Sequence, residues 1–311
     1  MRALYLFCCL FLGKISAFAI PQYYCPAANA PFFNNLVNLI GSIHRYNYDH
    51  LEEIAVFDLG MTSEQCETLK KMSKVQLYSL KDKNPALLTP FKIPTTTRIF
   101  LGWYAWKPVA IYESLEKFPY VLWMDAGCTV KKPLDALFAY IQREGYFLNT
   151  IGDEENEKGY AHSVGWGVTD FVRNKFKLTK PQFRWILEKE SVMATTFGLS
   201  KASKNLFLKE WVEMTKDMRH FADNGSCPGG WGACRHDQSL LSILAYQKQL
   251  KVHKIDYSQK RSIEIGTKDQ KIPFYITWNK DCMSDLTSVL TQDRGLHQYE
   301  QNVKNIRTKK D

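Results

Sequence analysis

Tyr120-Val121-Leu122-Trp123-Met124 is followed directly by Asp125-Ala126-Gly127, and this stretch is the strongest indication of the fold. Five consecutive apolar residues indicate a strand that is buried on both faces, as the strands of parallel sheets are. Ligands of open α/β sheets bind beyond the carboxyl ends of the strands, and Asp125 stands at such an end. Its carboxylate could hold a metal that bridges two phosphates, or a ribose hydroxyl. The alternative is a turn in which Asp125 accepts hydrogen bonds only from backbone amides.

Strand and helix patterns alternate on both sides of this stretch. In the first half we expect strands at 23–25, 54–57, 75–78 and 146–148, and helices at 34–46, from 62 or 63 to about 72, 103–118 and 134–142. A loop is expected at 81–98, and later elements are helices at 201–217 and 237–249 and strands at 252–255 and 274–277. Such alternation predicts an α/β protein whose mixed, mostly parallel central sheet is covered by helices on both faces.

The composition is that of one globular domain. Of the 311 residues, 45% are hydrophobic and 23% are charged, and we find neither an internal repeat nor a low-complexity linker. We therefore expect a single domain from residue 20 to residue 311. The net charge of +9 is dispersed rather than gathered in a basic block with stacking aromatics, so the sequence does not predict nucleic-acid binding.

The first 19 residues have the pattern of a signal peptide. Arg2 precedes a short apolar run at 3–12, which ends at Lys14, and Ala17-Phe18-Ala19 has the small-residue spacing of a cleavage site. The run is shorter than the ~20 residues that span a bilayer. We expect a cleaved signal peptide at 1–19, with an uncleaved type II anchor as the alternative, and no other membrane span. The protein would then be secreted, periplasmic, or in the lumen of the endoplasmic reticulum or Golgi.

Six cysteines remain after residues 1–19 are removed: Cys25, Cys66, Cys128, Cys227, Cys234 and Cys282. An oxidising compartment permits disulfides between them, although six cysteines allow many pairings. Cys227 and Cys234 bracket a glycine loop and are the pair to test first. The alternative is that most of the six are buried free thiols.

Three short blocks carry a resemblance to a known family. The block Trp123-Met124-Asp125-Ala126-Gly127, with Val130 and Lys132-Pro133-Leu134 after it, resembles the metal-site region of GT-A glycosyltransferases. Phe57-Asp58-Leu59-Gly60 and Tyr104-Ala105-Trp106-Lys107-Pro108 resemble a glycosyltransferase-like group with a WMD-type motif. The resemblance covers roughly residues 20–250 by the order of elements, and its specific blocks are short.

This resemblance implies a GT-A-like, Rossmann-like fold and the transfer of a sugar from a nucleotide-diphosphate donor to a glycan, protein or lipid acceptor. A half at about 20–150 would face the nucleotide, and a half at about 151–311 would face the acceptor. The resemblance also implies a divalent ion, Mn or Mg, at Asp125. Gly127 stands where the family has its second aspartate, however, so the paired-carboxylate clamp is incomplete.

Further donor-site residues are expected near the starts and ends of elements. Lys107 could neutralise the diphosphate, and Trp103 could stack on the base or the sugar, although Trp103 could equally be core and Lys107 solvated. Asp58 ends an early strand and could contact the ribose or base. Its alternative is structural: it caps the helix that begins near Ser63, or it fixes the turn to Gly60.

The glycine-rich stretch 225–232 and the residues after it are expected on the acceptor side. Trp231 is a candidate sugar-stacking side chain. The resemblance implies that Asp237 lies beside the acceptor, where a carboxylate could take the proton of the attacking hydroxyl as general base. The alternative for Asp237 is a simple helix N-cap, and His236 could instead reach a phosphate.

Two other functions are compatible with these residues. The first is a non-catalytic carbohydrate-binding or interaction protein on the same fold, which the glycine at 127 favours. The second is a secreted hydrolase with Asp125 and Asp237 as paired carboxylates, which requires the two carboxyl groups to lie about 5–10 Å apart.

Overall fold

The computed structural model describes residues 20–80, 83–151, 163–255, 263–266, 271–274, 276–278 and 299–309. The expected signal peptide at 1–19 and Cys282 lie outside these ranges. Within the ranges, no helix has both the length and the apolar character that crossing a bilayer requires.

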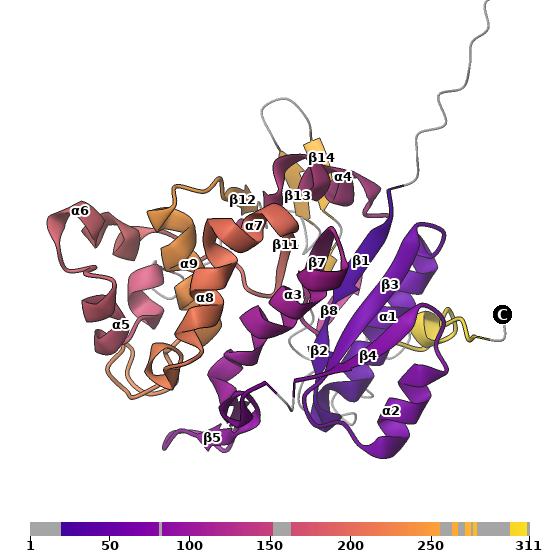
Figure 1. The fold of residues 1–311 in the computed structure, drawn as a ribbon, viewed down its shortest axis with the longest axis horizontal. Helices are drawn as coiled ribbons and strands as arrows, with labels where there is room; N and C mark the ends of the chain where they lie inside the picture. Colours follow the sequence, from indigo (N-terminus) through magenta and orange to yellow (C-terminus); the bar gives the residue numbers. More distant parts are fainter. Residues whose placement is uncertain are drawn as a thin grey trace, which may run out of the picture.

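A mixed sheet forms the centre of the described structure (Figure 1). Its strand order is β2-β3-β1-β7-β11-β9, and β4 also pairs with β3. The pairs among β1, β2, β3, β4 and β7 are parallel, whereas β11 is antiparallel to both β7 and β9. The predicted mostly parallel sheet is therefore confirmed. The strands are β1 (Gln22–Cys25), β2 (Ala27–Ala28), β3 (Leu51–Asp58), β4 (Val75–Ser79), β7 (Tyr120–Met124), β9 (Tyr146–Phe147) and β11 (Thr196–Ser200).

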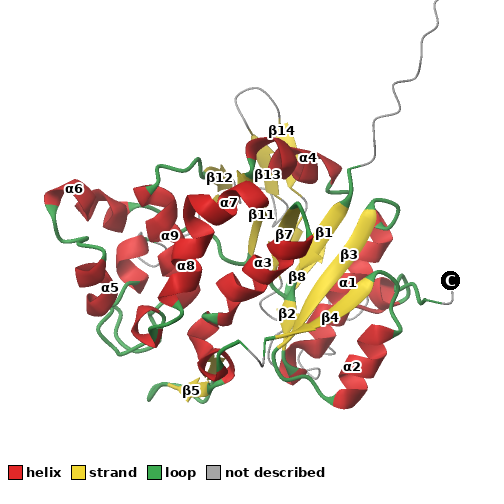
Figure 2. Ribbon diagram, in the orientation of Figure 1, coloured by secondary structure: helices red, strands yellow, loops and turns green. Residues whose placement is uncertain are grey.

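Helices cover both faces of this sheet (Figure 2). The apolar faces of α1 and α4 bury one side, and those of α3 and α9 bury the other. The helices are α1 (Phe33–Asn47), α2 (Ser63–Lys70), α3 (Trp106–Lys117), α4 (Asp135–Glu144), α5 (Asp170–Lys175), α6 (Pro181–Arg184), α7 (Lys201–Ser203), α8 (Lys209–Met214) and α9 (His236–Gln247). Single turns of 3-10 helix are η1 (Ala30–Phe32), η2 (Pro85–Leu88), η3 (Gly102–Tyr104), η4 (Val164–Gly167), η5 (Trp185–Glu188) and η7 (Met218–His220).

Strand β7 lies at the centre of the core because both of its faces are buried. Val121 and Trp123 belong to the cluster beneath α3 and α9, and Leu122 and Met124 belong to the cluster beneath α1 and α4. This alternation follows from the two-residue period of a strand. The uninterrupted apolar sequence of the strand is thus explained by burial on both sides.

Short paired strands surround the main sheet. They are β5 (Pro90–Lys92) with β6 (Ile99–Leu101), β8 (Cys128–Val130) with β15 (Ile276–Trp278), β10 (Asn149–Ile151) with β12 (His253–Ile255), and β13 (Ile263–Gly266) with β14 (Lys271–Phe274). The expectation of an unstructured loop at 81–98 was therefore wrong, because η2 and β5 lie within it. Pro85 and Pro90, two of the three prolines in this segment, begin these two elements.

Two predicted helices are divided in the structure. The helix expected at 103–118 begins only at Trp106, because Trp103 and Tyr104 have left-handed backbones with φ of 50° and 63°. The helix expected at 201–217 consists of α7, a π-helical turn at Lys204–Leu208, and α8. By contrast, the start of α2 has the predicted cap, since Thr62 and Gln65 form a reciprocal capping box.

Candidate functional site

Asp125 is fixed at the carboxyl end of β7 by contacts of its backbone and its side chain. The backbone N–H donates to the carbonyl of Thr195, at 2.8 Å. The carboxylate Oδ1 accepts a hydrogen bond from the indole Nε1 of Trp123 at 2.9 Å and lies 3.1 Å from Nζ of Lys107. The side chain remains 30% exposed, so it is anchored but still reachable from solvent.

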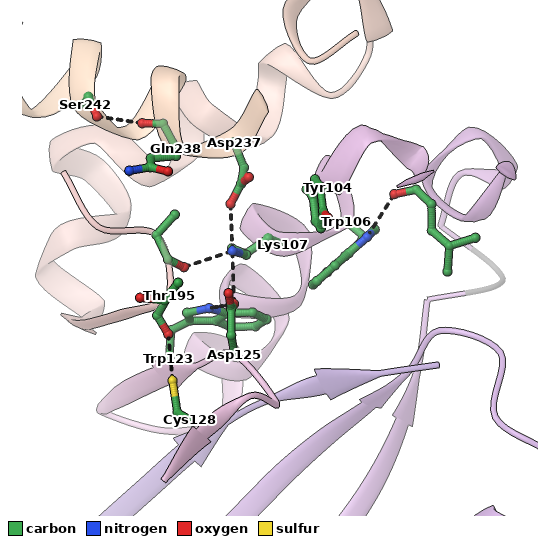
Figure 3. Close-up of polar contacts among 12 residues, drawn as sticks. Tyr104, Trp106, Lys107, Trp123, Asp125, Cys128, Thr195, Asp237, Gln238 and Ser242 are labelled. Atoms are coloured by element: carbon green, nitrogen blue, oxygen red, sulfur yellow. Dashed lines mark hydrogen bonds and ion pairs between the residues drawn. The ribbon is translucent and has the colours of Figure 1, made fainter. Parts of the chain in front are cut away.

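Lys107 joins Asp125 to Asp237 across the core. It extends from the first turn of α3, and its side chain is only 4% exposed. Besides Asp125, its Nζ lies 2.7 Å from Oδ2 of Asp237 and donates to the carbonyl of Ala194 at 2.9 Å (Figure 3). An ammonium has three N–H donors, and three acceptors surround this one. To contact donor phosphates, the ammonium of Lys107 would have to give up one of these three acceptors. This contact stays a prediction.

The charges of this trio stabilise one another. Burial alone would lower the pKa of Lys107. The carboxylates of Asp125 and Asp237 together have the larger, opposite effect, so the pKa of Lys107 is raised. Burial raises the pKa of Asp237, and the neighbouring ammonium opposes that rise without cancelling it. At neutral pH the trio therefore holds a protonated lysine between two acidic side chains.

Asp237 does not cap its helix. Helix α9 has Arg235 at the N-cap without a side-chain hydrogen bond, and Asp237 is the second helical residue. The alternative of a simple N-cap was thus wrong, because the carboxylate is directed to Lys107 instead (Figure 3). A negative charge in the first turn still interacts favourably with the helix dipole.

Strained backbone closely precedes both Lys107 and Asp237. Trp103, Tyr104 and His236 have φ of 50°, 63° and 43°, in the region that favours glycine. Each such residue costs about 1–3 kcal/mol and persists where the surroundings enforce it, commonly at functional sites. The residue types of Trp103 and Tyr104 offer no signal for this strain, whereas histidine is enriched in this backbone region.

Ring packing enforces this backbone. The ring of Trp103 stacks on that of His236 with centroids 5.3 Å apart, and the ring of Tyr104 lies 5.5 Å from it. Burial lowers the pKa of His236 to about 4, and its Nδ1 is 2.7 Å from the carbonyl oxygen of Phe221. His236 is therefore a neutral, buried member of the cluster, and the alternative that it reaches a phosphate is not supported. Trp103 is also buried here, at 6% exposure.

The other predicted donor-site residues are the last residue of β3, Asp58, and the turn residue Gly127. Oδ1 of Asp58 accepts from the backbone N–H groups of Gly60 and Met61 at 2.8 and 2.7 Å, which is the structural role expected as its alternative. Its contact with ribose stays a prediction. Gly127 is buried in the turn between Asp125 and β8.

The side chains at this site do not form the ligand set of a divalent ion. Across the described ranges, no group of three or more His, Cys, Asp or Glu side chains could hold a metal. Gly127 offers no side-chain ligand, and Oδ1 of Asp125 is already bonded to an indole and an ammonium. Mn or Mg at Asp125 therefore stays a prediction of the resemblance.

Arg98 is a site residue that no sequence pattern singled out. Its Nη2 donates to the hydroxyl of Tyr104 at 2.6 Å, and its guanidinium lies over the ring of Phe100. The side chain is exposed, so its other N–H donors are accessible to solvent. It lies at the end of a segment expected to be a loop, one residue before β6 and six residues before Tyr104.

A solved structure shares the architecture. An active-site mutant of LgtC superposes with a TM-score of 0.50 at 13% identity, covering 90% of this chain and 95% of the other. The fold is that of GT-A glycosyltransferases. The galactosyltransferase LgtC with donor and acceptor sugar analogues matches at a TM-score of 0.47 and 14% identity over 90% and 95% of the two chains. Mouse xyloside xylosyltransferase 1 matches at 0.46 and 14% over 85% and 100%. No family model and no curated protein matches the sequence.

Proposed function

We propose that this protein transfers a sugar from a nucleotide-diphosphate donor to an acceptor hydroxyl of a glycan, protein or lipid. The observation that carries the proposal is the ion-paired trio of Lys107, Asp125 and Asp237 at the carboxyl end of β7. A buried ammonium between two carboxylates is costly to build, and hydrophobic residues of the same volume would often be at least as stable. Its presence at the ligand-binding end of an α/β sheet supports a role in function.

Each member of the trio has a separate task in this proposal. Asp125, the most exposed of the three, contacts the sugar or ribose of the donor. Asp237 accepts the proton of the acceptor hydroxyl, and its raised pKa makes it a better base near neutral pH. Lys107 holds both carboxylates in the geometry that the reaction requires.

Sugar transfer exchanges one bond of the anomeric carbon for another. The bond between the anomeric carbon and the diphosphate oxygen breaks, and its electron pair leaves with the diphosphate. A bond between the acceptor oxygen and the anomeric carbon forms, and the hydroxyl proton passes to Asp237. The departing diphosphate gains negative charge, and the solvent-facing N–H donors of Arg98 are available to stabilise it.

A thermal-shift screen of UDP- and GDP-sugars, with and without manganese, tests the proposal. We expect at least one nucleotide sugar to raise the melting temperature of the wild type, and Asp125→Asn to reduce that shift. The same samples are assayed for release of the nucleotide diphosphate. Nucleotide binding without turnover would indicate a non-catalytic descendant, and absence of any nucleotide binding would contradict the proposal.

We also propose that the protein enters the secretory route through cleavage after residue 19. Expression of the full chain in a secreting host, followed by N-terminal sequencing of the product, tests this step. A mature chain beginning at Ile20 supports cleavage. An intact N-terminus that stays with membranes would indicate a type II anchor instead.

A further inference from the structure

The loop between η7 and α9 presents an exposed tryptophan on a rigid support. Trp231 is 42% exposed and stands between Gly230 and Gly232, whose φ values are 72° and 87°. Tryptophan is enriched at binding interfaces because it combines a large apolar ring with an N–H donor. We propose that Trp231 is a stacking platform for a sugar ring of the acceptor, an inference that rests on the proposed function.

The indole lies directly on the backbone of Gly225. A Cβ atom at position 225 would be 2.7 Å from both Cε2 and Nε1 of Trp231. No side chain therefore fits between the ring and the chain beneath it, and the φ of 76° at Gly225 also favours glycine. One side of the ring is thus supported by the loop itself, and the exposed surface of Trp231 is held in place.

A buried carboxylate holds this loop together. Asp223 is 5% exposed, and its two oxygens accept from the N–H of Gly225 at 2.9 Å and of Gly232 at 2.7 Å. The first of these glycines lies beneath the tryptophan, and the second follows it. Side chains of Cys227, Ala233 and Cys234 form a small buried cluster within the same loop. A platform fixed in advance loses little conformational entropy when a ligand binds.

The loop that carries Trp231 lies beside threonine hydroxyl groups. A Cβ atom at Gly232 would lie 3.9 Å from Oγ1 of Thr95 and 3.5 Å from Cδ1 of Ile93, so the loop contacts the turn of the β5–β6 hairpin. Residues 95–97 of that turn are three exposed threonines. An aromatic face beside hydroxyl groups suits a sugar, whose ring carries apolar C–H groups on its faces and hydroxyls at its edge.

The chain connection places this platform within reach of the ion-paired trio. Trp231 and Asp237 are six residues apart, so their Cα atoms are separated by at most about 20 Å. Since Asp237 is the proposed acceptor-side base, a saccharide that enters beside it could extend to Trp231. The platform is therefore assigned to the acceptor rather than to the nucleotide.

Disaccharide titration of the full-length protein tests this inference. The probes are lactose, N,N′-diacetylchitobiose and mannobiose, and the readout is the indole ¹H–¹⁵N resonance of Trp231, assigned with Trp231→Phe. We expect at least one disaccharide to shift this resonance. Trp231→Ala should weaken its binding by at least about tenfold, as loss of a buried aromatic anchor does, whereas Trp231→Phe should retain most of it.

Two further variants separate stacking from general damage. Trp185 is exposed to a similar extent, 39%, but its Nε1 donates to the carbonyl of Gln182 in the preceding helix α6, so Trp185→Ala should leave disaccharide binding unchanged. Gly225→Ala keeps the indole but displaces it, and should weaken binding as Trp231→Ala does. Equal binding by Trp231→Ala and Trp185→Ala, or no disaccharide effect on the Trp231 resonance, would overturn the inference.

Nucleotide binding distinguishes failure of the platform from failure of the proposed function. Trp231→Ala should bind nucleotide diphosphates with the same thermal shift as the wild type. A protein that binds nucleotides but no disaccharide contradicts the platform alone. A protein that binds a disaccharide at Trp231 but no nucleotide supports the platform and contradicts sugar transfer.

Discussion

Nζ of Lys107, from the first turn of α3, lies 2.7 Å from Oδ2 of Asp237, in the first turn of α9. The contact joins two helix starts that cover the same face of the sheet. Both side chains are almost fully buried, so water could not solvate either charge if its partner were removed. The pair therefore couples the stability of the core to the geometry of the proposed site.

Lys107→Met should destabilise the protein strongly. Removing the ammonium leaves two carboxylates close together without their cation, and breaking a buried pair in this way costs about 3–5 kcal/mol. Urea unfolding followed by circular dichroism measures the change in the free energy of unfolding. Lys70→Met is the control, because Lys70 pairs with Glu67 on the exposed surface of α2 and its loss should have little effect. Similar stabilities of the two variants would contradict the proposed coupling.

Acid should weaken the fold partly through His236. Its pKa is lowered from 6.5 to about 4 in the folded state, so between these values the unfolded chain binds more protons. The stability that comes from the neutral ring is present above pH 6.5 and is lost as the pH falls to about 4. The loss attributable to this residue is at most about 3 kcal/mol.

The check is urea unfolding of wild type and His236→Asn at several pH values between 7 and 4. Asparagine tolerates the left-handed backbone of residue 236 and does not titrate in this range. The variant should therefore lose less stability than the wild type as the pH falls. If the free energies of unfolding of the two proteins fall equally with pH, His236 is not the cause of the acid effect.

Sequence patterns predicted much of the fold because burial leaves a clear signature. Strand β7 follows from its apolar run, and α1 from its apolar stripe, both within one or two residues. The patterns failed where backbone geometry departs from residue preference. Trp103 and Tyr104 take left-handed φ values that their residue types do not favour, so the break before α3 was not predicted.

The sequence predicted the three ion-paired members of the candidate site, but not the contacts that Lys107 makes with both carboxylates. Asp125, Lys107 and Asp237 were each selected from the end of a strand or the start of a helix. Their convergence depends on which helices cover which face of the sheet, and no local pattern encodes this. Arg98 was not predicted because it ends a segment expected to be a loop, and no local pattern encodes its hydrogen bond to Tyr104.

Arg98→Ala should weaken binding of a nucleotide diphosphate. If its exposed guanidinium bonds to the diphosphate, losing a hydrogen bond to a charged group costs about 1.5–3 kcal/mol, or roughly tenfold or more in affinity. Calorimetric titration with UDP and GDP measures this. Arg219→Ala is the matched control, since that exposed arginine is engaged with Asp217. Equal affinities of the two variants would remove Arg98 from the donor site.

The described thiols should differ sharply in reactivity. Burial raises the pKa of both Cys25 and Cys128 to about 12, so these two remain protonated. Cys227 and Cys234 are also buried and are free in the structure, but they share a side-chain hydrogen bond, which lowers the pKa of Cys227. We expect iodoacetamide to modify Cys227 well before Cys25 or Cys128, and glutathione disulfide to link Cys227 to Cys234.

Differential alkylation and peptide mass spectrometry measure both reactions, and Cys234→Ala is the control for the linked peptide. Alkylation of Cys25 as fast as Cys227, or persistence of two free thiols in the loop under oxidant, would contradict this prediction.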